Sequence, residues 1–188
     1  ALMRTIPGMT ILNPADCVEA KAAVHAAAAY EGPVYLRFGR LAVEQIFDED
    51  YHFEIGKGVL LREGADVTIV GTGLMVGESL KAAEQLAAEG ISARVIDMHT
   101  IKPLDGEILL KAAQETGALV TAEEHSVIGG LGGAVSEYLS ECCPVPVLRV
   151  GVNDQFGRSG PAVDVLKRYG LTAENIVAKA KAAIAMKK

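Results

Sequence analysis

The stretch GADVTIVGTGLMVGESLKAAEQLAAEGISARVID, residues Gly64–Asp97, decides the fold. Its apolar run DVTIV, Asp66–Val70, predicts a buried strand, and the glycines of Gly71–Gly73 predict a tight turn. A helix is expected over Val76–Glu89, ended by the glycine that follows, and Ala93–Asp97 is expected to form the next strand. Strand, turn, helix and strand in this order predict a parallel βαβ unit.

The same alternation continues to the C-terminus. Strands are expected at Ala118–Ala122 and Val145–Val150, helices at Leu104–Thr116, Ala162–Tyr169 and Ala173–Met186, and a turn followed by a helix at Gly129–Leu139. Thr172 is the expected N-cap of the last helix. Strands that alternate with helices predict an α/β fold, here a three-layer, open, mostly parallel sheet with helices on both faces.

A separate strand–helix–strand pattern precedes this region. Met9–Asn13 and Val34–Phe38 are apolar runs that predict strands, with an alanine-rich helix ending at Tyr30 between them. Asp16 is the expected N-cap of that helix, with Glu19 three residues later as its capping-box partner. Because one crossover cannot cover both faces of a parallel sheet, we interpret this pattern as a partial βαβ from a second α/β domain. Its neighbours are expected to lie outside this chain.

Residues 41–58 carry acidic and aromatic side chains without a clear period, which is typical of a linker. We therefore divide the chain into an N-terminal segment of residues 1–43, a linker of residues 44–57 and a C-terminal domain of residues 58–188.

The composition narrows the classes of function. The chain has 188 residues, of which 50% are hydrophobic and 22% charged, and this excludes a disordered protein. It contains no uncharged apolar run long enough to span a membrane. A net charge of −6 argues against a nucleic-acid partner, since phosphate contacts need a basic face. Cys17, Cys142 and Cys143 have no disulfide-framework spacing, and they predict reduced thiols in a cytoplasmic protein.

The glycine-rich turn GTGLMVG, Gly71–Gly77, is the first candidate binding site. Such a turn between a strand and a helix can hold a pyrophosphate at the helix N-terminus. The dinucleotide fingerprint requires a third glycine where Val76 stands, although Asp97 lies near the position of the acidic residue that it expects. A nucleotide site and a plain tight turn both stay open, and the pattern favours the tight turn.

The second candidate is EEHSVIGGLGG, Glu123–Gly133, which follows a predicted strand. Its glycines could expose backbone N–H groups as an anion nest at the start of a helix. His125 stands beside two carboxylates, which would raise its pKa if they are close in space. One interpretation is a catalytic His–Glu pair, and the other is a structural turn that lets the helix pack closely on the sheet.

Other motifs predict neither metal nor hydrolase chemistry. The histidines lack the H-x-x-x-H and H-E-x-x-H spacings of zinc sites, and the chain has no G-x-S-x-G. These residues are His25, His52, His99 and His125. From these patterns we assign no catalytic and no metal-ligating residue to this chain.

The third candidate is Arg37-Phe38-Gly39-Arg40, at the carboxyl end of the second predicted strand. Ligands of open α/β sheets gather at the carboxyl ends of strands. Arginine is suited to bidentate binding of phosphate or carboxylate. Spacing alone leaves two roles open for either arginine, an anion ligand or a partner in a structural salt bridge.

Taken in order, the motifs resemble the C-terminal portion of transketolase over essentially the whole chain. The similarity is nearest to the C-terminal subunit of transketolases encoded as two chains. The motifs are IPGMTILNPAD, GPVYLRFGR, GADVTIVGTGLMVGESLKAAEQL, ARVIDMHTIKPLD, EEHSVIGGLGGAVSEYL and VGVNDQFGRSG. Much of this pattern is shared by 1-deoxy-xylulose-5-phosphate synthases and by the beta subunits of thiamine-dependent 2-oxo-acid dehydrogenases.

The resemblance implies an enzyme that transfers a two-carbon ketol unit between ketose and aldose phosphates in the pentose phosphate pathway. In this family, thiamine diphosphate and a divalent metal, Mg or Ca, lie between a diphosphate-binding and a pyrimidine-binding domain, at a dimer interface. The residues that activate the cofactor belong to sequence before Ala1, and the GDG…NN metal motif is absent. The resemblance therefore implies an N-terminal partner section, a homodimer or heterotetramer, and no cofactor binding or activity of this chain alone.

One functional residue transfers by its distance from Gly32-Pro33. The family's arginine that binds the phosphate of the sugar substrate matches Arg40, and Gly39-Arg40-Leu41 stands where single-chain transketolases tend to have Ser-Arg-Gln. Two other functions remain as alternatives. One is a different enzyme of the same superfamily, chiefly 1-deoxy-xylulose-5-phosphate synthase, and the other is a non-catalytic assembly or regulatory module.

Overall fold

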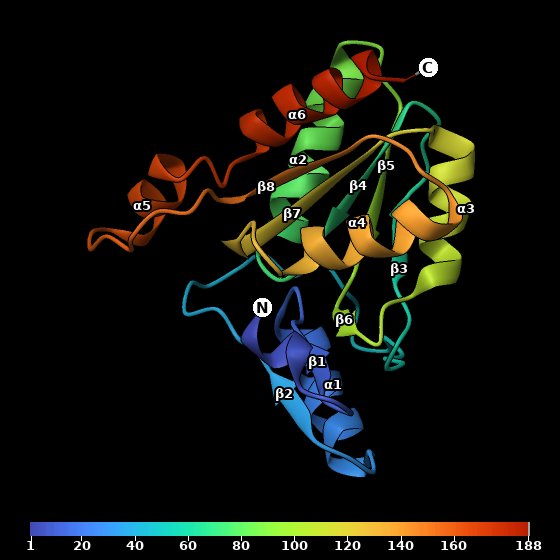
Figure 1. Cartoon of the computed structure of the whole chain (residues 1–188). Helices are drawn as coiled ribbons and strands as arrows, with labels where there is room; N and C mark the ends of the chain where they lie inside the picture. The colour runs from blue at the N-terminus through green and yellow to red at the C-terminus, as the bar shows by residue number, and fades with distance from the viewer. Residues whose placement is uncertain (188) are drawn as a thin grey trace.

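The larger sheet of the computed structural model has the strand order β3-β5-β4-β7-β8 (Figure 1). The structure describes residues 1–187, so the last residue of the predicted 58–188 domain lies outside the described residues. The strands are β3 (Val59–Arg62), β4 (Val67–Gly71), β5 (Ala93–Asp97), β7 (Leu119–Ser126) and β8 (Val147–Val152). All neighbouring pairs are parallel except β3 with β5, which is antiparallel. The mostly parallel sheet is therefore confirmed.

Helices cover this sheet on both faces, which confirms the three layers. α2 (Met75–Ala88) and α6 (Ala173–Ala185) share one apolar core with the sheet. α3 (Gly106–Thr116) and α4 (Leu131–Cys142) share the core on the opposite face. α5 (Ala162–Arg168) extends away from the body of the domain (Figure 1).

Local signals in the sequence explain where the helices begin and end. The Asp105 carboxylate accepts a hydrogen bond from the backbone N–H of Ile108 at the start of α3. The Thr172 hydroxyl accepts one from Asn175 at the start of α6, as its N-cap position predicts. Gly117 ends α3 with φ of 68°, a left-handed conformation that glycine adopts without strain.

The N-terminal segment forms the predicted βαβ. It contains β1 (Thr10–Leu12), α1 (Cys17–Ala29) and β2 (Val34–Leu36), preceded by the short 3-10 helix η1 (Leu2–Thr5). β1 and β2 are parallel, and Asp16 caps α1 by accepting from the N–H of Glu19 at 2.8 Å.

A strand of the C-terminal domain completes this second sheet, which the sequence pattern did not predict. β6 (Thr100–Lys102) pairs antiparallel with β1, so that the order is β2-β1-β6. The expectation that the neighbours of the segment all lie outside this chain is therefore wrong for one edge of β1. β3 was missed as well, because both strands are short and lack a hydrophobic period.

The linker has no helix or strand among the residues from 41 to 58, but it is not detached. Phe47 and Phe53 are buried against the N-terminal segment and the C-terminal domain, and Tyr51 lies between them. The three predicted free thiols, Cys17, Cys142 and Cys143, are unbonded within the described part of the chain.

Candidate functional site

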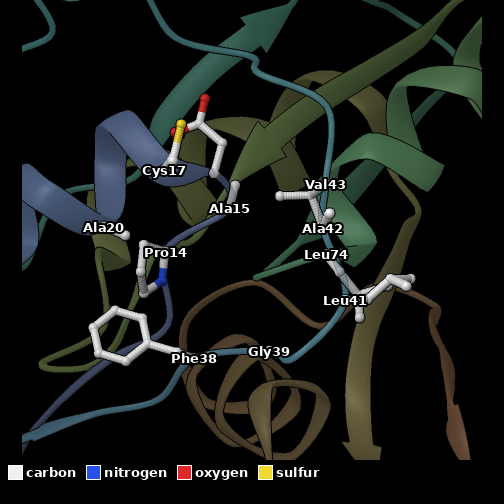
Figure 2. A pocket seen from close by; sticks show the side chains of 11 residues that line it. Pro14, Ala15, Cys17, Ala20, Phe38, Gly39, Leu41, Ala42, Val43 and Leu74 are labelled. Atoms are coloured by element: carbon white, nitrogen blue, oxygen red, sulfur yellow. The ribbon is translucent and has the colours of Figure 1, made fainter. Parts of the chain in front are cut away.

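The carboxyl end of β2 borders a cavity of about 320 Å³ (Figure 2). Gly39 and Leu41 line this cavity from one side, and Pro14 and Cys17, at the turn between β1 and α1, line it from another. Arg40 lies between two lining residues and is exposed. The hollow is lined by residues of the segment together with Leu74 of the C-terminal domain.

Asp16 fixes the position of the chain around this cavity. One carboxylate oxygen caps α1, and the other accepts hydrogen bonds from the backbone N–H groups of Ile46 at 2.7 Å and Phe47 at 2.9 Å. A single buried side chain therefore holds the start of α1 and the linker together.

Arg37 faces the C-terminal domain rather than a carboxylate. Its Nη2 donates to the backbone carbonyl of Glu124 at 2.6 Å. Arg37 and Arg40 therefore share one strand end, but Arg37 already has a protein partner while Arg40 is open to solvent.

The anion nest predicted at Glu123–Gly133 is filled by the protein itself. The buried carboxylate of Glu123 accepts hydrogen bonds from the N–H groups of Leu131 at 2.7 Å and Gly132 at 2.9 Å, at the start of α4. A Cβ on Gly130 would lie 2.0 Å from Glu123 Oε2, so glycine is required for this close approach. The geometry favours the structural turn.

The same geometry bears on the His–Glu pair. Nδ1 of His125 lies 2.7 Å from the backbone carbonyl of Ser126 and 3.8 Å from Glu123 Oε2. The shorter contact places the ring proton on Nδ1, which donates to that carbonyl. His125 is thus held by the backbone, and Glu123 is used for capping α4.

The glycine-rich turn at Gly71–Gly77, proposed above as a pyrophosphate site, is in contact with Asn13 of the N-terminal segment. The Gly73 N–H donates to the Asn13 carbonyl at 3.2 Å, and a Cβ on Gly73 would lie 2.8 Å from Asn13 Nδ2. Asn13 Nδ2 also donates to Thr72 Oγ1 at 3.2 Å. The turn is a docking point for the N-terminal segment, which favours the plain tight turn.

A buried acidic pair lies at the junction between the segment and the C-terminal domain. The carboxylate of Glu19 accepts from the Ala15 N–H at 2.7 Å and from the Tyr51 hydroxyl at 2.8 Å. Burial, followed by the charge of Glu19, raises the pKa of Asp97 well above its ordinary value. Neither carboxylate oxygen of Asp97 has a hydrogen-bond partner among the described residues, and the charge of Glu19 adds to the cost of ionising it.

A buried histidine, His99, stands two residues after Asp97. Its ring stacks on Phe53 with centroids 4.2 Å apart, and its Nδ1 lies 2.9 Å from Thr100 Oγ1. Burial lowers the pKa of His99 to about 4. The sequence pattern offered no signal that Glu19 lies close to Asp97, because the two residues are far apart in the chain.

The chain matches two families of protein domains. Residues 56–176 match the transketolase C-terminal domain, and residues 1–45 match the transketolase pyrimidine-binding domain. The chain belongs to the transketolase family.

The chain matches part of the length of longer relatives. It is 51% identical to the 6-deoxy-6-sulfo-D-fructose transketolase subunit SqwH of Clostridium sp. (strain MSTE9), over 94% of this chain and 55% of the relative. It is 42% identical to a 1-deoxy-D-xylulose-5-phosphate synthase of Heliobacterium modesticaldum, over 94% of this chain and 28% of the relative. This transketolase-family chain thus spans about half the length of the first of these relatives and less of the second.

A solved structure has nearly the same fold. The chain is 53% identical to a protein described as "Split gene transketolase, inactive beta4 tetramer", with a TM-score of 0.97, over 100% of this chain and 61% of that one. The predicted transketolase C-terminal-domain fold is therefore confirmed.

The two glycine-rich turns offer no open site for a diphosphate in the part of the chain that the structure describes. Both glycine-rich turns are filled by Asn13 and Glu123, as described above. Among residues 1–187, no group of three or more His, Cys, Asp or Glu side chains is placed to hold a metal ion. None of the helices in this range is long and apolar enough to cross a membrane.

Proposed function

We propose that this chain is the C-terminal section of a transketolase that transfers a two-carbon ketol unit from a ketose phosphate to an aldose phosphate, in carbohydrate metabolism of the pentose phosphate type. The observation that supports this proposal is Arg40, an exposed arginine of a transketolase-family chain at the carboxyl end of β2. The chain's contribution is to bind and orient the substrate, while thiamine diphosphate supplies the carbanion chemistry when it is bound.

Arg40 is proposed to bind the phosphate group of the sugar. The guanidinium offers a planar fork of donors that matches phosphate oxygens. Because the phosphate is remote from the reacting carbonyl and is unchanged in the reaction, Arg40 is expected to stabilise the ground state and the transition state equally. Its contribution is therefore expected in KM rather than in kcat.

The proposed partner is an N-terminal transketolase section, which would bind thiamine diphosphate together with Mg or Ca. Two observations support this: the chain spans about half of the relative SqwH, and its own glycine-rich turns are filled by protein atoms. We propose a cytoplasmic homodimer or heterotetramer that includes this section, and no activity of the chain by itself.

The test of the phosphate site is Arg40→Ala in the complex with the N-terminal section. Loss of charge-assisted hydrogen bonds is expected to raise the KM for phosphorylated sugars about 10- to 100-fold, with kcat changed by less than about 2-fold. Arg168→Ala, at an exposed arginine of α5, is the matched control and should leave KM unchanged. An unchanged KM in Arg40→Ala would refute the assignment.

A second candidate activity is that of 1-deoxy-D-xylulose-5-phosphate synthase, which the relative of that name supports. The complete complex should be assayed with pyruvate and with a ketose phosphate as the donor. Turnover with the ketose phosphate alone supports the transketolase, and turnover with pyruvate alone supports the synthase.

A non-catalytic assembly module is the candidate of another class. Calorimetric titration of this chain with thiamine diphosphate and Mg is expected to give no binding heat. A stoichiometric endpoint would place the cofactor on this chain and overturn the proposed division between the two sections.

A further inference from the structure

The end of β7 reaches the N-terminal segment at the strand end that carries Arg40. The sequence predicted that this strand ends at Ala122, but β7 continues to Ser126. The four added residues carry the backbone carbonyl of Glu124, and Arg37 of the segment donates to it at 2.6 Å. One hydrogen bond therefore joins the two units three residues before Arg40.

The acceptor of this bond belongs to a fixed part of the C-terminal domain. Glu123 is buried and tied to the start of α4 through the N–H groups of Leu131 and Gly132. On the other side of Glu124, Ser126 pairs with Val152 of β8. The carbonyl of Glu124 thus lies between Glu123 and Ser126, both of which are bonded within the C-terminal domain.

Arg37, the donor of this hydrogen bond, directly follows the last residue of β2. The backbone N–H of Arg37 donates to the Leu12 carbonyl at 2.8 Å. The residues that follow Arg37 form neither helix nor strand until β3. Beyond Arg37, a Cβ on Gly39 would lie 3.9 Å from the Glu124 carboxylate, so the Glu124 side chain runs beside the same stretch. The stretch from Arg37 to Gly39, which leads to Arg40, therefore lies beside Glu124 of the C-terminal domain.

We infer that Arg37 is a positioning residue for Arg40, acting through the backbone carbonyl of Glu124. The inference rests on the proposed function, in which Arg40 binds the substrate phosphate. Through the hydrogen bond between Arg37 and Glu124, the C-terminal domain sets the position of Arg40, which belongs to the N-terminal segment. Arg37 itself is half-buried and uses its Nη2 on protein, whereas Arg40 is free to meet the ligand.

A double-mutant cycle in the complex with the N-terminal section tests this inference. Arg37→Ala is expected to raise the KM for phosphorylated sugars about 3- to 10-fold, and Arg40→Ala to raise it more. In the Arg40→Ala background, Arg37→Ala should change KM no further, because its effect passes through Arg40. Additive effects would mean that Arg37 binds phosphate independently, and they would overturn the inference.

Arg4 supplies the matched control at the same junction. Its Nη1 donates to the backbone carbonyl of Gly129 at 2.9 Å, and its Nη2 pairs with Glu137 at 2.5 Å, but it is remote in sequence from Arg40. Arg4→Ala should lower the melting temperature without raising KM. An equal rise of KM in Arg4→Ala would show a general loosening of the junction and would contradict a specific role of Arg37.

A conservative variant separates positioning from folding. Arg37→Lys keeps a donor that can reach the Glu124 carbonyl. Its rise in KM is therefore expected to be at most about half of the rise seen in Arg37→Ala. If Arg37→Ala fails to fold, Arg37→Lys and Arg37→Gln are compared instead, and an equal KM in both would overturn the inference. An unchanged KM in Arg40→Ala is the separate result that refutes the phosphate site itself.

Discussion

The C-terminal domain and the N-terminal segment bury their side chains in different ways. Every residue of β4 and β5 is buried, because helices cover both faces of the sheet. In the segment, all residues of β2 are at least partly exposed, and the buried residues of α1 are Glu19 and Ala23. The C-terminal domain is organised around two larger apolar clusters, whereas the segment contributes a few residues to two smaller clusters that the linker also joins.

The difference shows how the segment is held. Asn13, Asp16, Glu19 and Arg37 make hydrogen bonds from the segment to the linker or the C-terminal domain, in addition to the apolar contacts of Phe47 and Phe53. A buried hydrogen bond needs a defined partner, because an unpaired buried polar group is costly. These hydrogen bonds therefore help to define how the segment, which carries Arg40, is placed on the C-terminal domain.

The largest expected effect is a difference in the free energy of unfolding between a variant in the core of the C-terminal domain and a variant in the N-terminal segment. Leu86 of α2 is fully buried, and Leu86→Ala should lower the free energy of unfolding by about 2–5 kcal/mol. Leu36→Ala in the partly exposed β2 should cost less than about 1.5 kcal/mol. Urea denaturation of both variants measures the difference, and equal losses would contradict the comparison.

The second effect concerns the pH dependence of the junction. The pKa of His99 is lowered to about 4 when folded, against 6.5 as its ordinary value. The unfolded chain then binds more protons between these values, so stability should fall by up to about 3 kcal/mol as the pH drops from 6.5 to 4. His99→Asn should reduce this slope, and His25→Asn, at an exposed histidine, should leave it unchanged.

The third effect concerns the cap of α4. Glu123→Ala leaves two buried N–H groups without an acceptor and should lower the free energy of unfolding by about 2–3 kcal/mol. Glu124→Ala is the neighbouring control, since it retains the backbone carbonyl that Arg37 uses. Its cost should be below about 0.5 kcal/mol by thermal or chemical denaturation. A similar cost for both variants would show that the cap does not stabilise the domain.

The last effect concerns the buried carboxyl group of Asp97. Since burial raises the pKa of Asp97, the folded protein keeps a proton that the unfolded chain releases above its ordinary value of 3.8. Asp97 therefore lowers stability as the pH rises from about 4 toward neutrality, opposite in sign to His99. Asp97→Asn removes the ionisable group, and it should make the chain more stable at pH 7 than the unsubstituted protein. A gain that does not grow with pH would contradict the raised pKa.

Much of the fold was predictable because the signals for it are local. The period of apolar residues predicted α2, α3, α4 and α6 within a few residues of their bounds. Asp16 and Thr172 were predicted as caps because the capping bond spans only three residues. β3 and β6 were missed, since each is a short edge strand defined by its partner rather than by its own pattern.

For the candidate site, the sequence by itself determined that Arg37 and Arg40 stand at one strand end, because the order of elements fixes where a strand stops. Only the tertiary structure decided that Arg37 bonds to Glu124 and that Glu123 fills the predicted nest. These contacts join residues far apart in the chain, and they depend on how the two units dock. Local propensity carries no information about such docking, whereas the packed structure specifies each partner.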